Sequence, residues 1–364
     1  MFIYLFILFS LYLLGLFDIN NGISNNQKRK IFYIVIFFFW ILSFIRWETG
    51  TDWESYHDCF ANNDTLYEFE MRGFEPFYTY LNFFIKQVTD YYWILLMICG
   101  LIIYPLTSKT IVRYSPLPFI SLLVYLLLRR ADIFFVRESI AIAFCFYSIR
   151  YIQTRELWKF VIYVLIGFQF HNAVIAFLPA YYIYNIDIDT KKCLYFLAGL
   201  IVIMTILQEK ITSTFGQVAT LLGDSFLDKT DKYLERGYDT GGATSVAAAM
   251  IRGSINRCIL LAIFLYGVRK HKKGKFVKGM LNLYMTSIAL FALLAPFSLT
   301  LNRIGNTYEM PAILLAGYVF DKMPHKNKKF YYLLFYTYIV IRFFMGTLYG
   351  VYSEEFLPFK TIFD

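Results

Sequence analysis

Long apolar stretches recur along the whole chain and are separated by short polar segments. Many of them approach the length of roughly 20 apolar residues that a transmembrane helix needs, and the polar faces of soluble helices are missing. The pattern therefore predicts an all-α polytopic membrane protein, a single transmembrane domain over residues 1–364 with about 12 transmembrane helices. The expected spans are Phe2–Phe17, Ile31–Ile45, Tyr91–Ser108, Leu117–Leu128, one from near Phe135, two short spans within Leu157–Tyr184, Cys193–Leu207, Ile251–Val268, Met280–Phe297, Met310–Asp321 and Phe330–Thr347.

The composition supports a membrane protein and excludes a large soluble helical one. Of the residues, 58% are hydrophobic, 21% are aromatic and 17% are charged, whereas soluble domains carry about 25% charged residues. The net charge of +9 does not indicate a nucleic-acid partner, because most Lys and Arg residues fall in short loops between spans. The first apolar run lacks a basic start and a small-residue cleavage site, so we expect a retained span.

Clusters of basic residues set the expected orientation in the membrane. Lys28-Arg29-Lys30 and the run from Arg269 to Lys275 are placed in the cytoplasm, which gives the inner loops a net positive and the outer loops a net negative charge. Two long outer loops are then expected, at about residues 46–90 and 209–250. The first contains Phe74–Val88, where aromatic and polar residues alternate at helical spacing, which predicts an interfacial helix.

The stretch Leu157–Tyr184 decides the topology downstream of it. It is interrupted by Gln169-Phe170-His171-Asn172, and we divide it there into two short spans. A single tilted helix through His171 would reverse the orientation of every later loop.

The cysteines and acidic residues do not form a metal-binding pattern. The five cysteines are scattered without a Cys-x-x-Cys pair, and the expected outer loops contain neither an Asp-x-Asp motif nor a histidine cluster. We expect no disulfide framework, no metal and no cofactor.

The expected outer side collects charged residues at the ends of spans. Arginine offers planar, bidentate donors to phosphate oxygens, and fixed cations stabilise the charge of a departing diphosphate. A nearby carboxylate or imidazole can take the proton from an attacking sugar hydroxyl. The pattern indicates transfer from a lipid-linked phosphate. The residues are Arg46, Asp52, Glu75, Arg129, Arg130, Arg137, Glu138, His171 and Arg303.

Each of these residues also has a structural interpretation. Arg129 and Arg130 end a span and can snorkel to lipid headgroups. Arg137 and Glu138 can form a structural pair, although an arginine within the membrane is by default a functional candidate. His171 can be a satisfied buried histidine.

For the remaining candidates the alternatives concern the membrane interface. Arg303 begins a span and can anchor it there. Tyr56, with neighbouring tryptophans, suits either an aromatic belt or a sugar-stacking surface. Asp52 and Glu75 lie in a loop with many acids, so sequence alone assigns them little.

Short motifs occur in a fixed order along the chain, and together they resemble the EpsG-like branch of bacterial Wzy-type polysaccharide polymerases over nearly the whole length. Glutamine would be more usual than Glu138 after the arginine, and tyrosine more usual than Phe359 after the proline. The motifs are Arg46…Gly50-Thr51-Asp52…Tyr56, Gly73-Phe74-Glu75-Pro76-Phe77, Arg137-Glu138-Ser139-Ile140-Ala141, Phe170-His171-Asn172-Ala173, Arg303…Tyr308 and Leu357-Pro358-Phe359-Lys360.

The resemblance implies a multi-pass glycosyltransferase of the bacterial cytoplasmic (inner) membrane with a GT-C-like fold, generally working without a metal. Such an enzyme joins oligosaccharide repeat units carried on undecaprenyl diphosphate, outside the membrane, into exopolysaccharide, capsule or O-antigen. The implied partners are the undecaprenyl-diphosphate-linked oligosaccharide, membrane lipid, and chain-length regulator and flippase proteins.

We assign expected roles on this basis. Arg137 and Arg303, helped by Arg46, hold the donor diphosphate. Asp52, Glu75 or His171 orients or deprotonates the acceptor hydroxyl. The outer loop Glu209–Ala249 covers or guides the growing chain. Further substrate contacts are expected from Tyr56, Arg129, Arg130, Glu138 and Tyr308.

Three other functions compete with this interpretation. An O-antigen ligase-like transferase uses the same chemistry with a different acceptor. A polysaccharide flippase or exporter would carry polar residues down the middle of many spans and often an internal repeat, which this sequence lacks. A membrane acyltransferase is disfavoured because His171 has no matching catalytic histidine pattern early in the chain.

Overall fold

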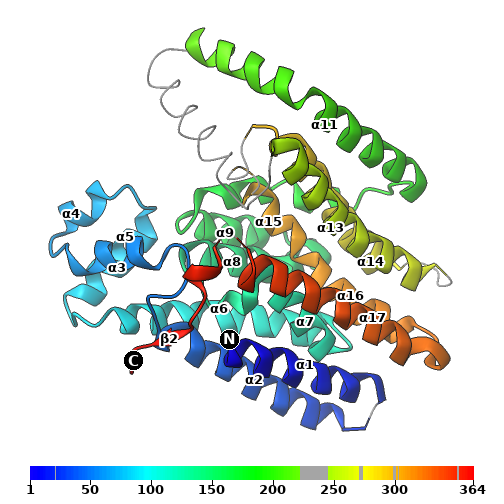
Figure 1. Cartoon of the computed structure of the whole chain (residues 1–364), viewed down its shortest axis with the longest axis horizontal. Helices are drawn as coiled ribbons and strands as arrows, with labels where there is room; N and C mark the ends of the chain where they lie inside the picture. Colours follow the sequence, from blue (N-terminus) through cyan, green and yellow to red (C-terminus); the bar gives the residue numbers. More distant parts are fainter. Residues whose placement is uncertain (21, 222–244, 270–273, 298–300, 302, 351) are drawn as a thin grey trace. The chain divides into compact units, whose positions relative to one another are not determined.

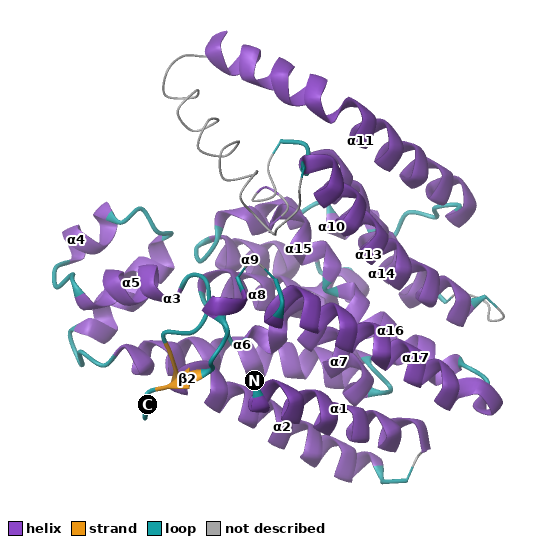
Figure 2. Cartoon of the chain, viewed as in Figure 1, coloured by secondary structure: helices purple, strands orange, loops and turns teal. Residues whose placement is uncertain are grey.

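The computed structural model describes residues 1–20, 22–221, 245–269, 274–297, 301, 303–350 and 352–364, and most of this described chain is helical (Figures 1 and 2). The chain divides into two compact units, one formed by Met1–Tyr181 with Ile313–Asp364 and the other by Tyr182–Ala312. Among the described helices, six are long and apolar enough to cross a membrane, which confirms a multi-pass, all-α membrane protein.

The first unit contains most of the helices and the only β-pairing of the described chain. In its N-terminal part the elements are α1 (Phe2–Asn20), α2 (Asn25–Ile45), β1 (Arg46–Trp47), α3 (Trp53–Ala61), α4 (Leu66–Met71), α5 (Pro76–Lys86), α6 (Tyr92–Tyr114), α7 (Pro118–Arg129), η1 (Arg130–Asp132), α8 (Arg137–Thr154), α9 (Leu157–Phe168), η2 (Asn172–Phe177) and α10 (Ala180–Ile183), which runs into the second unit. Its C-terminal part contains most of α16 (Pro311–Lys322), then α17 (His325–Phe343), the π-helical turn η4 (Phe344–Leu348), η5 (Ser353–Glu355) and β2 (Lys360–Thr361).

Helix α7 lies in the middle of this unit and is buried on nearly all sides, as expected of a short helix that is apolar all round. The first N–H groups of a helix need acceptors, and here the acceptor comes from another helix. The Asp18 carboxylate on α1 accepts from the backbone N–H of Phe119 at 2.7 Å and of Ile120 at 3.3 Å. Lys28 pairs with the same carboxylate at 3.4 Å, so the buried charge is compensated.

Helices α2, α6, α8 and α9 pack in series, each against the next. Glycines allow two of these approaches. A Cβ on Gly100 of α6 would lie 2.4 Å from the Trp40 ring of α2, and a Cβ on Gly167 of α9 would lie 2.9 Å from the Ala141 carbonyl oxygen of α8. Close packing at Gly167 matters for function because α9 ends immediately before the His171 turn.

The C-terminal residues pack against the turn that follows α2. Strand β2 pairs antiparallel with β1, with Arg46 opposite Thr361 and Trp47 opposite Lys360. The Gly50 N–H donates to the Glu355 carbonyl oxygen at 2.6 Å, and Gly50 adopts φ +111°, a conformation that glycine tolerates best. The C-terminal segment of the chain is therefore joined to the N-terminal part of the first unit at the turn after α2.

The second unit is built from α11 (Thr190–Leu221), α13 (Val246–Val268), α14 (Lys275–Leu294) and α15 (Arg303–Glu309), with α14 in contact with each of the other three. An ion pair at 2.5 Å between Arg257 of α13 and Glu309 of α15 joins two of these helices.

Several sequence predictions can be compared with these elements. A helix is present within Phe74–Val88 as α5, whose expected place at the membrane interface stays a prediction, and the chain breaks at His171 as expected. Helix α11 continues to Leu221 through the strong helix formers Gln208-Glu209-Lys210, so its C-terminal part covers the start of the expected outer loop 209–250, and α13 begins at Val246. The outer position of this loop stays a prediction. Residues 222–244 lie outside the described residues. About 12 spans, a GT-C-like fold and a single domain stay predictions.

The close approach at Gly167 can be tested by adding one methyl group. We expect Gly167→Ala to lower the free energy of unfolding by about 1–3 kcal/mol, because the new Cβ meets a backbone oxygen that cannot move aside freely. Thermal unfolding of the detergent-solubilised protein measures this. Gly199→Ala is the matched control, since nothing lies within 4 Å of a Cβ there. Equal behaviour of the two variants would contradict the packing argument.

Candidate active site

Three segments of the first unit meet at the side chain of Glu75. This residue precedes α5 in an extended conformation, with Pro76 as the first helical residue. Gly73, at φ +71°, turns the chain between α4 and α5. The start of α5 is tied to the turn after α9 because the Phe77 N–H donates to the Gln169 carbonyl oxygen at 3.1 Å.

Both oxygens of the Glu75 carboxylate accept hydrogen bonds. Arg137, the first residue of α8, donates through Nη1 to Oε2 at 2.5 Å. The other oxygen, Oε1, accepts the Asn172 backbone N–H at 3.0 Å and lies 3.3 Å from His171 Nδ1. The side chains of Glu75, His171 and Arg137 are 6%, 14% and 16% exposed, so the cluster is largely removed from water.

These contacts fix the charge of Glu75. Burial alone would raise the pKa of its carboxyl group. The hydrogen bond from His171, the charge of Arg137 and the Asn172 N–H outweigh burial and lower the pKa from 4.5 to about 2. The group is therefore ionised at neutral pH and is a weak base.

His171 is held by this carboxylate in one orientation. With Nδ1 facing Glu75, the neutral ring carries its proton on Nδ1 and leaves Nε2 as an acceptor. Nε2 is buried and has no hydrogen-bond partner among the described residues. A carboxylate that orients an imidazole and stabilises its protonated form is a standard arrangement for a general base.

Arg137 supplies a cation beside the imidazole. Its guanidinium lies over the ring of Phe74 at 4.6 Å and near that of Tyr56 at 5.8 Å. One edge faces Glu75, while Nε is buried without a partner in the described part of the chain. The cluster thus contains an oriented base and a positive charge side by side, and Tyr56 from the expected site borders it.

Arg129, Asp132 and Glu138 form a separate buried network that fixes the turn before α8. Arg129 contacts Asp132 at 3.0 Å, Ser139 at 2.9 Å and Glu138 at 3.4 Å. Tyr125 donates to the other Asp132 oxygen at 2.7 Å. Arg129 therefore pairs inside the protein and does not snorkel, and Glu138 pairs with it and not with Arg137.

The turn itself is strained. Arg130, Ala131 and Asp132 all have positive φ values, of 47°, 55° and 53°, which side chains other than glycine adopt at a cost. Arg130 does not reach towards lipid either. It donates to the Thr347 hydroxyl at 3.0 Å and to the Gly346 carbonyl oxygen at 2.9 Å. This turn determines where α8 begins, and hence where Arg137 lies.

Arg46 and Asp52 belong to the turn between α2 and α3. Arg46 is 1% exposed and donates to the Thr49 carbonyl oxygen at 2.6 Å. Asp52 directly precedes α3. The observed contacts of Arg46 hold the turn together.

Arg303 and Tyr308 lie in the second unit, both on α15, with Arg303 exposed at its start and Tyr308 buried. Their placement relative to the Glu75 cluster stays a prediction. Sequence reasoning missed the Arg257–Glu309 pair on α13 and α15. A lone arginine in the apolar Ile255–Val268 stretch was the available signal, because such charges inside a span need a partner.

The lowered pKa of Glu75 predicts a specific pH dependence of stability. The ionised carboxylate stabilises the folded state fully above pH 4.5, and this contribution is lost as the pH falls towards 2. Relative to Glu75→Gln, the wild type should lose an additional 2–3 kcal/mol, roughly, of unfolding free energy over this interval. Unfolding in detergent from pH 7 to pH 2 measures it, with the exposed Glu70→Gln as control. Parallel curves for wild type and Glu75→Gln would show that the carboxylate is not paired.

Comparison with known proteins adds one finding. No curated protein and no solved structure matches the chain. The model of the EpsG family matches residues 29–361, nearly the whole length. The match contains every motif of the resemblance, including those of the Glu75 cluster. The chain belongs to the EpsG family, a family of Wzy-like polysaccharide polymerases.

Proposed function

We propose that this protein is a membrane glycosyltransferase that polymerises polysaccharide repeat units. The glycosyl donor is an undecaprenyl-diphosphate-linked oligosaccharide, the acceptor is a sugar of a second lipid-linked unit, and transfer occurs at the outer face of the bacterial cytoplasmic membrane. The observation that carries the proposal is the cluster of Glu75, His171 and Arg137. It combines an oriented imidazole with a cation suited to phosphate, and family membership supports the substrate class.

In the proposed reaction, His171 is the general base. Its Nε2 takes the proton from the acceptor hydroxyl as that oxygen attacks the anomeric carbon of the donor. The bond between this carbon and the diphosphate oxygen breaks, and the lipid diphosphate leaves with the electron pair. Glu75 stabilises the imidazolium that forms, and Arg137 balances the charge of the departing diphosphate.

The geometry favours His171 over the two carboxylates considered as base. A pKa of about 2 makes Glu75 a poor proton acceptor at neutral pH, whereas it suits a group that orients a histidine. Asp52 directly precedes α3, and the ion-pair partner of both Arg137 and His171 is Glu75. His171 Nε2 remains as a buried acceptor among the described residues that no other group occupies.

The other expected site residues receive secondary roles in this proposal. Tyr56 borders the cation and offers a ring for sugar stacking. For Arg303 and Tyr308, on α15 of the second unit, the diphosphate and sugar contacts expected from the sequence stay predictions. Arg46, Arg129, Arg130 and Glu138 act by fixing the turns on which the cluster depends. An O-antigen ligase-like transferase would use the same cluster, so the acceptor distinguishes the two enzymes.

Complementation of a deletion strain tests the proposal. Deletion should collapse the ladder of surface polysaccharide on a gel to single repeat units, and wild type should restore it. His171→Gln and Arg137→Lys should each reduce polymer about 100-fold or more, because the first removes the base and the second the planar donors facing the diphosphate. Protein levels in the membrane are measured in parallel.

Matched controls come from the same expected side of the membrane. His57→Gln and Arg72→Lys change the same residue types on α3 and at the end of α4, and both should support normal ladders. Full-length polymer from His171→Gln at normal protein level would disprove the role of the base. Loss of all surface sugar on deletion, with lipid-linked repeats retained inside, would identify a flippase instead. Unchanged chain length with loss of transfer to the lipid A core would identify a ligase.

A further inference from the structure

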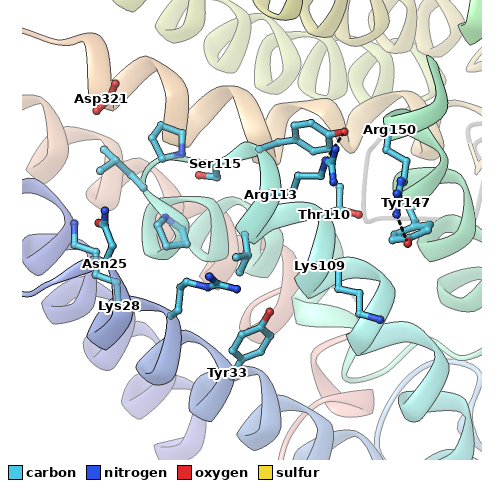
Figure 3. A pocket seen from close by; sticks show the side chains of 16 residues that line it. Asn25, Lys28, Tyr33, Lys109, Thr110, Arg113, Ser115, Tyr147, Arg150 and Asp321 are labelled. Carbon is cyan, nitrogen blue, oxygen red and sulfur yellow. Dashed lines mark hydrogen bonds between the residues drawn. The ribbon is translucent and has the colours of Figure 1, made fainter. Parts of the chain in front are cut away.

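A basic pocket lies beside the C-terminal part of α8, the helix whose first residue, Arg137, belongs to the Glu75 cluster. It has a volume of about 790 Å³ and is lined by the first turns of α2, the last turns of α6 and α8, the loop into α7 and the end of α16, all in the first unit (Figure 3). Its basic lining residues are Lys28, Arg29, Lys109, Arg113 and Arg150.

Most of the positive charge in the basic pocket is uncompensated. Lys28 is paired with Asp18, and Asp321, the single acidic residue of the described lining, is paired with Lys322 at 3.0 Å. Within the described chain, no acidic oxygen lies within 4.0 Å of the side-chain nitrogens of the other four basic residues. Like charges that line one cavity create a positive potential, which attracts an anion. The four are Arg29, Lys109, Arg113 and Arg150.

Two of the guanidinium groups are held in place by tyrosines. Arg113 Nε donates to the Tyr114 hydroxyl at 3.1 Å, and Arg150 Nη1 donates to the Tyr147 hydroxyl, as the dashed lines in Figure 3 mark. Orienting a guanidinium through one N–H keeps its remaining donors at fixed positions, which suits the oxygens of a phosphate.

An apolar groove continues from the basic pocket along α2 and α6. Its volume is about 310 Å³, and it shares Tyr33 and Lys109 with the pocket. Trp40 lines it, with its indole N–H bonded to the Met97 carbonyl oxygen at 3.0 Å and its ring in the space that Gly100 leaves open. The remaining lining residues are Ile36, Phe37, Leu101, Tyr104, Pro105 and Ser108.

We propose that the basic pocket and the apolar groove together bind one lipid whose phosphate headgroup carries a net negative charge. The phosphate lies among Arg29, Lys109, Arg113 and Arg150, and a hydrocarbon chain lies in the groove. A soluble phosphate compound would use the pocket alone and leave the groove without a role. Basic pockets between transmembrane helices are known to recognise anionic headgroups, and an apolar extension adds the energy of chain burial.

This lipid site is separate from the proposed active site. On α8, Arg150 lies thirteen residues after Arg137, which places the two about 20 Å apart along the helix axis. Lys28 and Arg46 likewise lie at opposite ends of α2. In the expected orientation the pocket faces the cytoplasmic leaflet. The proposal does not depend on polymerase activity.

Native mass spectrometry of the full-length protein in detergent tests the site. The probe is dioleoyl phosphatidic acid, with dioleoyl phosphatidylcholine as the lipid without net charge and inorganic diphosphate as the anion without a chain. Wild type should bind phosphatidic acid at least about tenfold more tightly than either. Arg113→Gln with Arg150→Gln should abolish this preference, because it removes both oriented forks.

A second pair of variants separates pocket from surface charge. Lys191→Gln with Lys192→Gln removes the same charge from exposed positions on α11 and should bind phosphatidic acid like wild type. Leu101→Trp fills the groove, leaves every basic residue in place and should weaken lipid binding about fivefold. Leu207→Trp, on the exposed face of α11, should have no effect.

Three results would overturn the proposal. The first is that the double arginine variant binds phosphatidic acid as tightly as wild type. The second is that the Lys191 and Lys192 variant loses as much affinity for phosphatidic acid as the double arginine variant. The third is that wild type binds diphosphate as tightly as phosphatidic acid. The last would identify a soluble phosphate ligand. All of these readouts are binding measurements, so a protein that lacks polymerase activity would still answer them.

Discussion

A single carboxylate, that of Glu75, holds the candidate active site together. Taking a guanidinium and a carboxylate out of water costs several kcal/mol per ion, and only a close, well-bonded pair offsets this. Glu75 offsets it by accepting from Arg137 and from the Asn172 N–H while facing His171. Arg137 belongs to α8, and His171 and Asn172 belong to the turn after α9. The carboxylate that orients the histidine therefore also joins the start of α5 to both of these segments.

The site also depends on a strained turn that makes no contact to substrate in the proposed mechanism. Three successive residues with positive φ between α7 and α8 each cost on the order of 1 kcal/mol. The network of Arg129, Asp132 and Ser139 is buried and fully bonded, so it can maintain this conformation. A change at Arg129 would therefore act on catalysis through the position of Arg137.

The positions of many helices and three residues of the candidate site could be predicted from the sequence, for different physical reasons. The spans follow from the cost of exposing backbone in lipid, so apolar runs locate helices well. The sequence predicts Glu75, Arg137 and His171 as site residues, because ionisable groups at the ends of membrane spans are costly and often functional. Their mutual contacts could not be predicted, since Glu75 and His171 are 96 residues apart and their turns meet only in the folded chain, where the Phe77 N–H also bonds to the Gln169 carbonyl oxygen.

Other parts required side-chain contacts that sequence does not encode locally. From the sequence, Arg129 and Arg130 suit both snorkelling to lipid headgroups and substrate binding. Only their contacts with Asp132 and Thr347 show that they turn inward. The end of α11 at Leu221 does not follow from hydropathy alone, because the apolar residues give way to Gln208-Glu209-Lys210, which nevertheless favour a helix.

The distribution of charge in the first unit separates the two proposed sites, which share only helix α8. Ionised groups are expensive at the bilayer centre, so they collect at helix ends, and α2, α6 and α8 each span from one end to the other. At one end, acids match the cations and build a closed cluster around Glu75. At the other end, the four cations of the basic pocket have no matching acid in the described chain. That difference is the physical reason why the first end suits chemistry on a transient substrate, while the second suits a resident anion.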